Sequence, residues 1–155
     1  DLYQSLGPAP VGDLDYFIPF GKALVRRKGG AVTILTYSAM VQQTLLAVAE
    51  TGVDAEVIDL RCLDHAGLDW ETIGASIAKT NTVMIVEQGP RGASWGGAIA
   101  DEIQRRFFDW LDHPVERVSG KEASPSISKV LERASYAASA EVAAALNALP
   151  KAVAR

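Results

Sequence analysis

The sequence predicts an α/β domain in which helices cover both faces of a mostly parallel sheet. Residues 83–86 form an apolar run without polar alternation, and residues 32–37 are rich in β-branched side chains. Both patterns are typical of strands that are buried on both faces. Residues 22–27 are a short segment with polar flanks, which suits an edge strand. Because helical segments alternate with these strands, right-handed crossovers and a parallel sheet are expected.

A helix and a further strand follow residues 32–37. Ser38 is expected to cap a helix over about residues 39–50, which Gly52 ends. The apolar face of this helix consists of Val41, Leu45 and either Val48 or Ala49. Residues 54–60 then supply the next strand.

The alternation continues through the middle of the chain. Asp69 is expected to cap a helix that ends at Asn81, with Trp70, Ile73 and Ile77 on one face. The strand at residues 83–86 stops at Glu87 and a glycine-rich turn. Its following helix carries apolar residues at helical spacing, namely Ile99, Ile103, Phe107 and Trp110.

The last third of the chain supplies one more strand and two weaker helices. The strand is predicted over residues 114–118, and residues 121–128 form a loop. A helical turn is expected over residues 129–134, and an alanine-rich helix over residues 139–149 with Ser139 as its cap.

Length and composition predict one compact domain. The chain has 155 residues, 48% of them hydrophobic. Residues 1–17 are expected to be a linker from a missing upstream domain, residues 18–149 the domain and residues 150–155 a tail.

The charge, the cysteine content and the hydropathy bound the class of partner. A net charge of −4 without a strong basic cluster argues against nucleic acid as the main partner. No apolar run approaches the roughly 20 residues of a membrane span. The lone Cys62 fits a reducing compartment, so we expect the cytoplasm, or the mitochondrial matrix in a eukaryote.

The turn that follows residues 83–86 is the main functional candidate. Glycines between a strand and a helix are typical of phosphate-binding loops, but the spacing of Gly89, Gly92, Gly96 and Gly97 fits neither the dinucleotide motif nor the P-loop. A turn that packs against another subunit is therefore favoured over a phosphate site. Glu87 is interpreted as a carboxylate that binds helix-start amides or a partner's arginine. The candidate subunit-interface residues are Glu87, Gly89, Arg91, Gly92, Trp95 and Gly96.

No other group of residues predicts chemistry. His65 and His113 precede turns and have no Ser or Cys partner at the spacing of a catalytic triad, so both are expected on the surface. Cys62 is expected to be a small buried residue. The four aspartates at positions 54, 59, 64 and 69 fall on different elements, which argues against a metal site. We therefore predict no catalytic, cofactor-binding or metal-binding residue.

Seven short segments form an ordered set of motifs: residues 18–23 (IPFGKA), 32–38 (VTILTYS), 59–61 (DLR), 68–73 (LDWETI), 79–81 (KTN), 86–89 (VEQG) and 108–115 (FDWLDHPV). In this order they resemble the C-terminal domain of transketolase-like enzymes, in particular the β subunit of the decarboxylating component of 2-oxo acid (pyruvate or branched-chain) dehydrogenase complexes. The resemblance covers residues 18–149, with departures at residues 64–67 and at Gln88.

This resemblance implies a three-layer αβα fold with a five-stranded sheet, in which the strand at residues 22–27 is an antiparallel edge. It also implies a role in assembly within an oxidoreductase that uses thiamine diphosphate and Mg²⁺, with no cofactor bound and no activity shown by this chain alone. The implied partners are the pyrimidine-binding domain, the α subunit and the acyltransferase core, in a homodimer or heterotetramer. Two alternatives are the matching domain of a deoxyxylulose-phosphate synthase or transketolase, and a free-standing module that binds a phosphorylated ligand.

Overall fold

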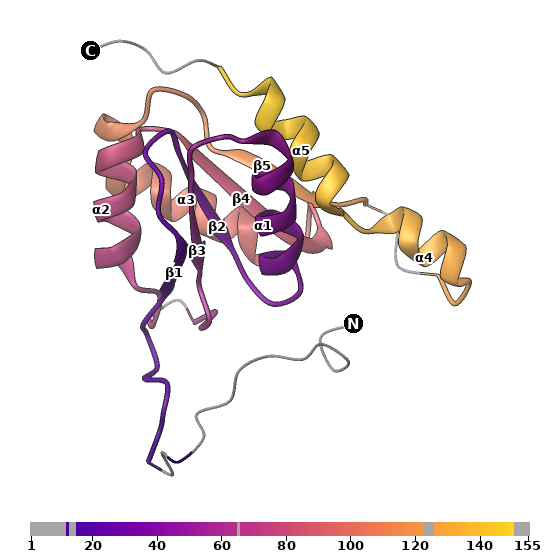
Figure 1. The fold of residues 1–155 in the computed structure, drawn as a ribbon, viewed down its shortest axis with the longest axis horizontal. Coiled ribbons are helices and arrows are strands. Elements are labelled where there is room, and N and C mark those ends of the chain that lie inside the picture. Colours follow the sequence, from indigo (N-terminus) through magenta and orange to yellow (C-terminus); the bar gives the residue numbers. More distant parts are fainter. Residues whose placement is uncertain (1–11, 13–14, 65, 123–125, 151–155) are drawn as a thin grey trace.

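The protein is described by a computed structural model that covers residues 12, 15–64, 66–122 and 126–150. These residues form one sheet of five strands in the order β1-β3-β2-β4-β5 (Figure 1). The strands are β1 (Leu24–Arg27), β2 (Val32–Thr36), β3 (Ala55–Asp59), β4 (Val83–Pro90) and β5 (Glu116–Gly120). The prediction of a five-stranded sheet is confirmed.

The sheet is parallel except at one edge. β1 pairs with β3 antiparallel, whereas β2 pairs with β3 and β4 in parallel, and β4 pairs with β5 in parallel. The carboxyl ends of β2, β4 and β5 therefore lie at the same end of the sheet. β1 is the predicted antiparallel edge strand, and β5 forms the opposite edge.

The helices form one layer on each face of the sheet. They are α1 (Met40–Thr51), α2 (Trp70–Thr80), α3 (Trp95–Phe107), α4 (Lys129–Ser135) and α5 (Ser139–Ala148), with a short 3₁₀ helix η2 (Phe108–Trp110). The apolar core on one face joins the sheet to α1 and α5, and the core on the other joins it to α2 and α3. The predicted three-layer αβα architecture is therefore confirmed. Helix α4 stands away from these layers (Figure 1).

Each central strand contributes side chains to both cores, because successive side chains of a strand point to opposite faces of the sheet. In β4, Met84 and Val86 belong to the core with α1 and α5, whereas Val83 and Ile85 belong to the core with α2 and α3. All four side chains are at most 1% exposed. The uninterrupted apolar run reflects this burial on two faces.

The predicted ends of two helices are confirmed. Gly52 ends α1 in the left-handed region with φ 68°, and its N–H donates to the Val48 carbonyl at 3.0 Å. The Asp69 carboxylate caps α2 by accepting from the Thr72 N–H at 3.2 Å and from the Thr72 hydroxyl at 2.9 Å. Burial alone would raise the pKa of Asp69, but these hydrogen bonds and the nearby Lys22 lower it.

Two predicted caps are wrong. The N-cap position of α1 is occupied by Ala39, whose side chain accepts no hydrogen bond. Ser38 lies one residue earlier and has φ 55°. Ser139 is the first residue of α5 rather than its cap. There the Glu141 carboxylate instead accepts from the Ala138 N–H at 2.9 Å, because a helix can satisfy its first donors from within its own first turn.

Two other boundaries also differ from the prediction. β4 does not stop at Glu87 but continues to Pro90, because β5 lies alongside it as far as Gly120. Trp110 lies in η2, beyond the end of α3, and is 48% exposed, so it does not continue the apolar face of that helix. Most of the predicted linker and tail lies outside the described residues, and the domain boundaries remain predictions.

Candidate functional site

The most organised polar group of the domain lies where β4 leads into α3. The Glu87 side chain is completely buried, directly after the apolar run at residues 83–86 of β4. A buried carboxylate is costly unless charged and hydrogen-bonding partners surround it. The partners of Glu87 come from the residue that follows β2, from α3 and from β5, so this one side chain links three parts of the fold to its own strand.

Three donors surround the Glu87 carboxylate. The Gly96 N–H at the start of α3 donates to Oε2 at 2.7 Å, and the Tyr37 hydroxyl donates to the same oxygen at 3.1 Å. The Arg117 guanidinium donates to Oε1 at 2.7 Å and forms an ion pair with it. A charged acceptor with three donors is the arrangement in which burial of a carboxylate is tolerated.

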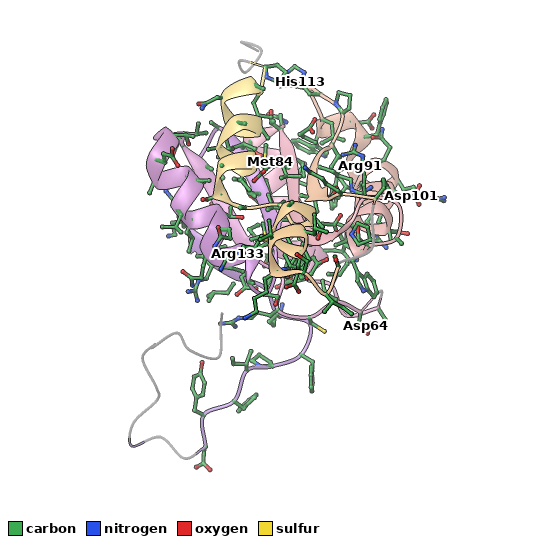
Figure 2. The ribbon with its side chains drawn as sticks, turned by 90° about the vertical axis from the view of Figure 1, so that its right-hand side faces the viewer. Asp64, Met84, Arg91, Asp101, His113 and Arg133 are labelled. Atoms are coloured by element: carbon green, nitrogen blue, oxygen red, sulfur yellow. The ribbon has the colours of Figure 1, made fainter. Side chains whose placement is uncertain are left out.

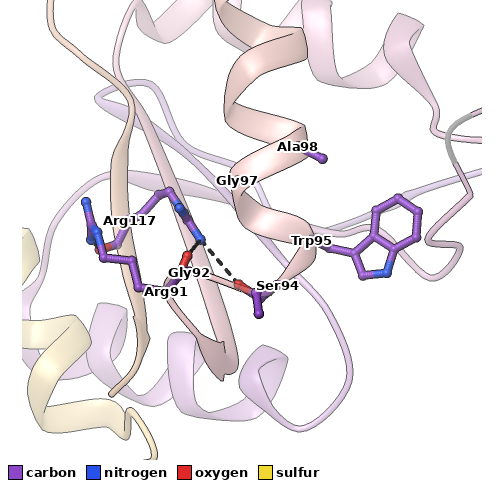
Figure 3. Close-up of a pocket in the computed structure, with 8 residues that line it drawn as sticks. Arg91, Gly92, Ser94, Trp95, Gly97, Ala98 and Arg117 are labelled. Carbon is purple, nitrogen blue, oxygen red and sulfur yellow. Dashed lines mark hydrogen bonds between the residues drawn. The ribbon is translucent and has the colours of Figure 1, made fainter. Parts of the chain in front are cut away.

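Arg117 also holds the loop between β4 and α3. Its Nη2 donates to the Arg91 carbonyl at 2.9 Å and to the Ser94 hydroxyl at 3.2 Å (Figure 3). Arg91 in turn donates from Nη1 to the Arg117 carbonyl at 3.0 Å. The loop is therefore bound to β5 at two places, and the charge of Arg117 is shared between Glu87 and the loop.

Gly96 is required because the carboxylate comes close to the helix backbone. A Cβ atom placed on Gly96 would lie 2.1 Å from the Oε1 atom of Glu87, which is far inside van der Waals contact. The short N–H bond from residue 96 to the carboxylate needs this approach. Gly96 thus reflects the packing of this chain on itself, not the approach of a ligand.

Tyr37 responds to the same buried charge. Burial of the phenol is the largest cause that raises its pKa, followed by the charge of Glu87 and the hydrogen bond to it, while Arg117 acts in the opposite direction. The phenol therefore stays protonated far into the alkaline range. In that form it is a permanent donor to Glu87.

A surface pocket opens beside this group. It has a volume of about 480 Å³ and is lined by Arg91, Gly92, Ala93, Ser94, Trp95, Gly97, Ala98 and Arg117. Figure 3 shows Arg117 at one side of the pocket and Trp95 at the other, with the first turn of α3 between them.

The six candidate interface residues separate into two groups. Arg91 and Gly92 are exposed, and Gly89 and Trp95 are half-buried next to them. Glu87 and Gly96 are buried within the chain, where they support the neighbouring loop. The assignment of all six residues to a subunit interface stays a prediction. The interpretation of Glu87 as a ligand of a helix-start amide agrees with its bond to Gly96, while its arginine comes from the same chain.

Sequence reasoning missed Tyr37, Ser94 and Arg117. The one signal for Arg117 was its place in the strand predicted over residues 114–118. Nothing in the sequence pairs it with a carboxylate that lies 30 positions earlier.

The other candidate residues do not form a site. His113 and Asp64 lie at opposite ends of the domain (Figure 2). Cys62 is half-buried instead of buried, and His65 lies outside the described residues. Among the described residues, no group of three or more His, Cys, Asp or Glu side chains is placed to hold a metal ion.

The start of α3 also differs from a phosphate-binding turn. Such turns present bare amides to the anion. Here the Gly96 amide donates to Glu87, and the Gly97 amide donates to the Ser94 carbonyl at 3.3 Å. Glu87 therefore holds the position that a bound phosphate would need.

None of the helices in the described ranges combines the length and apolar character that a membrane crossing requires.

Comparison with curated proteins identifies relatives that are longer than this chain. The pyruvate dehydrogenase E1 component subunit beta of Rickettsia conorii is 42% identical, over 74% of this chain and 39% of its own length. The 2-oxoisovalerate dehydrogenase subunit beta of Pseudomonas aeruginosa is 43% identical, over 71% of this chain and 31% of its own length. The chain thus spans well under half of the length of these relatives.

The fold is also found among solved structures. A protein described as a split gene transketolase, an inactive beta4 tetramer, superposes with a TM-score of 0.69 at 23% identity, over 91% of this chain and 45% of the other. The model of the family described as "Transketolase, C-terminal domain" matches residues 21–149. This match spans all five strands and both helical layers, and the chain belongs to the transketolase C-terminal domain family.

Proposed function

We propose that this chain is the C-terminal assembly domain of a thiamine diphosphate-dependent 2-oxo acid dehydrogenase, in the β subunit of the decarboxylating component. The observation that carries the proposal is that the polar group around Glu87 binds the chain to itself and fixes a surface loop. The three donors to Glu87 all come from the chain itself and hold its own elements together. The names of the relatives favour a dehydrogenase over the transketolase and synthase alternatives.

The parent enzyme would supply the cofactor from its other domains. Thiamine diphosphate stabilises the carbanion that decarboxylation creates, and its diphosphate needs a cation and free amide donors. The described residues do not fit this group, because they hold no cluster of metal ligands and the Gly96 amide is engaged by Glu87. We therefore assign no catalytic step to this chain.

Exposed apolar side chains support a role in contacts. Phe17 and Phe20 are 77% and 96% exposed on the segment before β1. Ile127, just before α4, is 102% exposed, and Val130, in α4, is 78% exposed. Burial of these side chains against a partner would remove apolar surface from water, which suits a role in contacts. We assign these contacts to the pyrimidine-binding domain, the α subunit and the acyltransferase core of the parent complex, in the cytoplasm or the mitochondrial matrix.

A domain replacement tests the proposal. Residues 21–149 would replace the matching segment of the Rickettsia conorii β subunit, and this chimera would be expressed together with the α subunit of that enzyme. Sedimentation velocity would measure the mass of the complex, and release of carbon dioxide from pyruvate would report its activity. We expect a complex of the same mass as the parent, with activity that needs thiamine diphosphate.

Two controls make the result interpretable. The parent complex provides the reference mass, and circular dichroism with urea unfolding shows that the chimera is folded. A folded chimera that remains separate from the α subunit and from a second β subunit would contradict the proposal.

A further inference from the structure

Arg117 has hydrogen-bond donors that none of the described residues uses. Its side chain is only 12% exposed, and its hydrogen bonds to the described residues are all donated by Nη2. Its Nε is buried and has no partner among the described residues, which costs free energy. Nη1 also donates to none of the described residues, and it is not among the buried atoms. Nη1 is therefore the donor that an acceptor from outside the chain could reach.

Gly97 opens the guanidinium to the pocket. A Cβ atom placed on Gly97 would stand 3.5 Å from Nη1 and 3.9 Å from Cζ of Arg117. The missing side chain therefore leaves space directly over the unused donor. In Figure 3, Gly97 lies on the first turn of α3 beside the Arg117 guanidinium. Gly96 makes room for Glu87 inside the chain, whereas Gly97 makes room on the pocket side.

The charges of the pocket favour an anion. Its only charged lining residues are Arg91 and Arg117, and the first turn of α3 carries no acidic side chain. No carboxylate of the described residues pairs with Arg91. Two acids lie nearby: Glu87 behind Arg117, and Glu122, whose Oε2 would be 3.1 Å from a Cβ on Gly92. Glu122 lines an adjoining pocket.

We propose that this pocket receives the carboxylate of an acidic side chain from a neighbouring subunit. The inference rests on the proposed assembly function, because Arg91, Gly92 and Trp95 belong to its candidate interface. The volume of about 480 Å³ is more than a single carboxylate needs and accommodates a whole acidic side chain with part of its backbone. Arg91 and Arg117 would both donate to the carboxylate, one from the rim and one from the floor.

The chimeric complex described above provides the test, with three single variants. Gly97→Ala fills the space over Arg117 while both arginines stay in place, and Arg91→Ala removes the rim donor. Arg26→Ala is the matched control, because Arg26 is an exposed arginine on β1, at the opposite edge of the sheet. Sedimentation would give the dissociation constant of each complex at two salt concentrations. Urea unfolding of the free chimeras would check that each variant is folded.

We expect Gly97→Ala and Arg91→Ala to raise the dissociation constant by roughly tenfold or more and to flatten its salt dependence. Arg26→Ala should change it by less than about twofold. The inference is overturned if the wild-type chimera assembles and both pocket variants assemble equally well. It is also overturned if assembly is unchanged while succinate or inorganic phosphate shifts the Gly97 amide signal in the NMR spectrum of this chain, since the pocket would then hold a free anion. If even the wild-type chimera fails to assemble, the proposed function itself fails.

Discussion

The ion pairs at the two ends of α3 differ in their exposure to solvent. At its start, Glu87 and Arg117 are 0% and 12% exposed, and their ion pair sits among hydrogen bonds from three elements. Near its end, Arg105 pairs with Asp101 at 2.8 Å while these side chains are 70% and 59% exposed. The distances are alike, so distance alone does not indicate what a pair contributes. Burial determines how much an ion pair matters for stability. Water solvates an exposed charge that loses its partner, but it cannot reach a buried charge.

The two kinds of ion pair also differ in how much of the fold they need. The exposed pairs follow from residues four apart on one helix and need no other element. The buried pair exists only when β4, β5 and α3 have come together. Its formation fixes the loop that carries Arg91, so the surface of the candidate interface depends on it.

The largest expected effect is that of Glu87→Ala. Removal of the carboxylate leaves Arg117 buried without a counter-charge, and the free energy of unfolding should fall by about 3–5 kcal/mol. Urea unfolding followed by circular dichroism measures this change. Glu102→Ala, in an exposed pair with Arg106, is the control and should move the midpoint only slightly. Equal shifts for the two variants would break the comparison.

Gly96→Ala should have the next largest effect. The new methyl group would meet the Glu87 carboxylate at 2.1 Å, so the carboxylate or the helix must move, at a cost of about 1–3 kcal/mol. Gly97→Ala is its matched control, because the neighbouring position leaves ordinary contact distances and alanine favours the helix by up to about 1 kcal/mol. Urea unfolding of both variants compares them. Stabilisation by both substitutions would show that Glu87 does not constrain the helix start.

Tyr37→Phe should lower stability by about 1 kcal/mol, because it removes one of the donors to Glu87. The pH dependence sharpens the test. The raised pKa of Tyr37 means that its contribution is complete below the unfolded value of about 10 and is lost as the pH rises above it. Urea midpoints between pH 8 and 11 should therefore fall more steeply for the wild type than for the variant. Parallel slopes would contradict the placement of the phenol beside a buried carboxylate.

The smallest effect is expected from Arg105→Ala. Its pair with Asp101 lies in solvent, so the thermal midpoint should stay within experimental error of the wild type, with little dependence on salt. A marked loss of stability would mean that the end of α3 is as strongly coupled to the fold as its start.

Local patterns in the sequence predicted most of the architecture. Apolar runs located β2 and β4 because these strands are buried on both faces. Asp69 and Asn81 marked the ends of α2, because a capping side chain and a left-handed residue each act within one helical turn. The prediction failed at Ser38. Serine is a residue type typical of helix caps, yet the chain turns through a left-handed conformation there before α1 begins.

The same limit applies to the candidate site. The glycine turn was located, and Glu87 was interpreted as a ligand of a helix-start amide. Its partner Arg117 comes from β5 and its partner Tyr37 from the residue that follows β2, on the other side of β4, and no local pattern specifies either one. Gly96 and Gly97 look alike in the sequence, and only the packing shows that they face different neighbours.

The central claim is that this chain supplies contacts and not chemistry. The most direct test is the release of carbon dioxide from pyruvate or 3-methyl-2-oxobutanoate by the purified chain, with thiamine diphosphate and Mg²⁺ present. The chimeric complex, assayed side by side, would serve as the positive control. We predict no release above a reaction without protein. Release by the chain alone, in proportion to its concentration, would contradict the account.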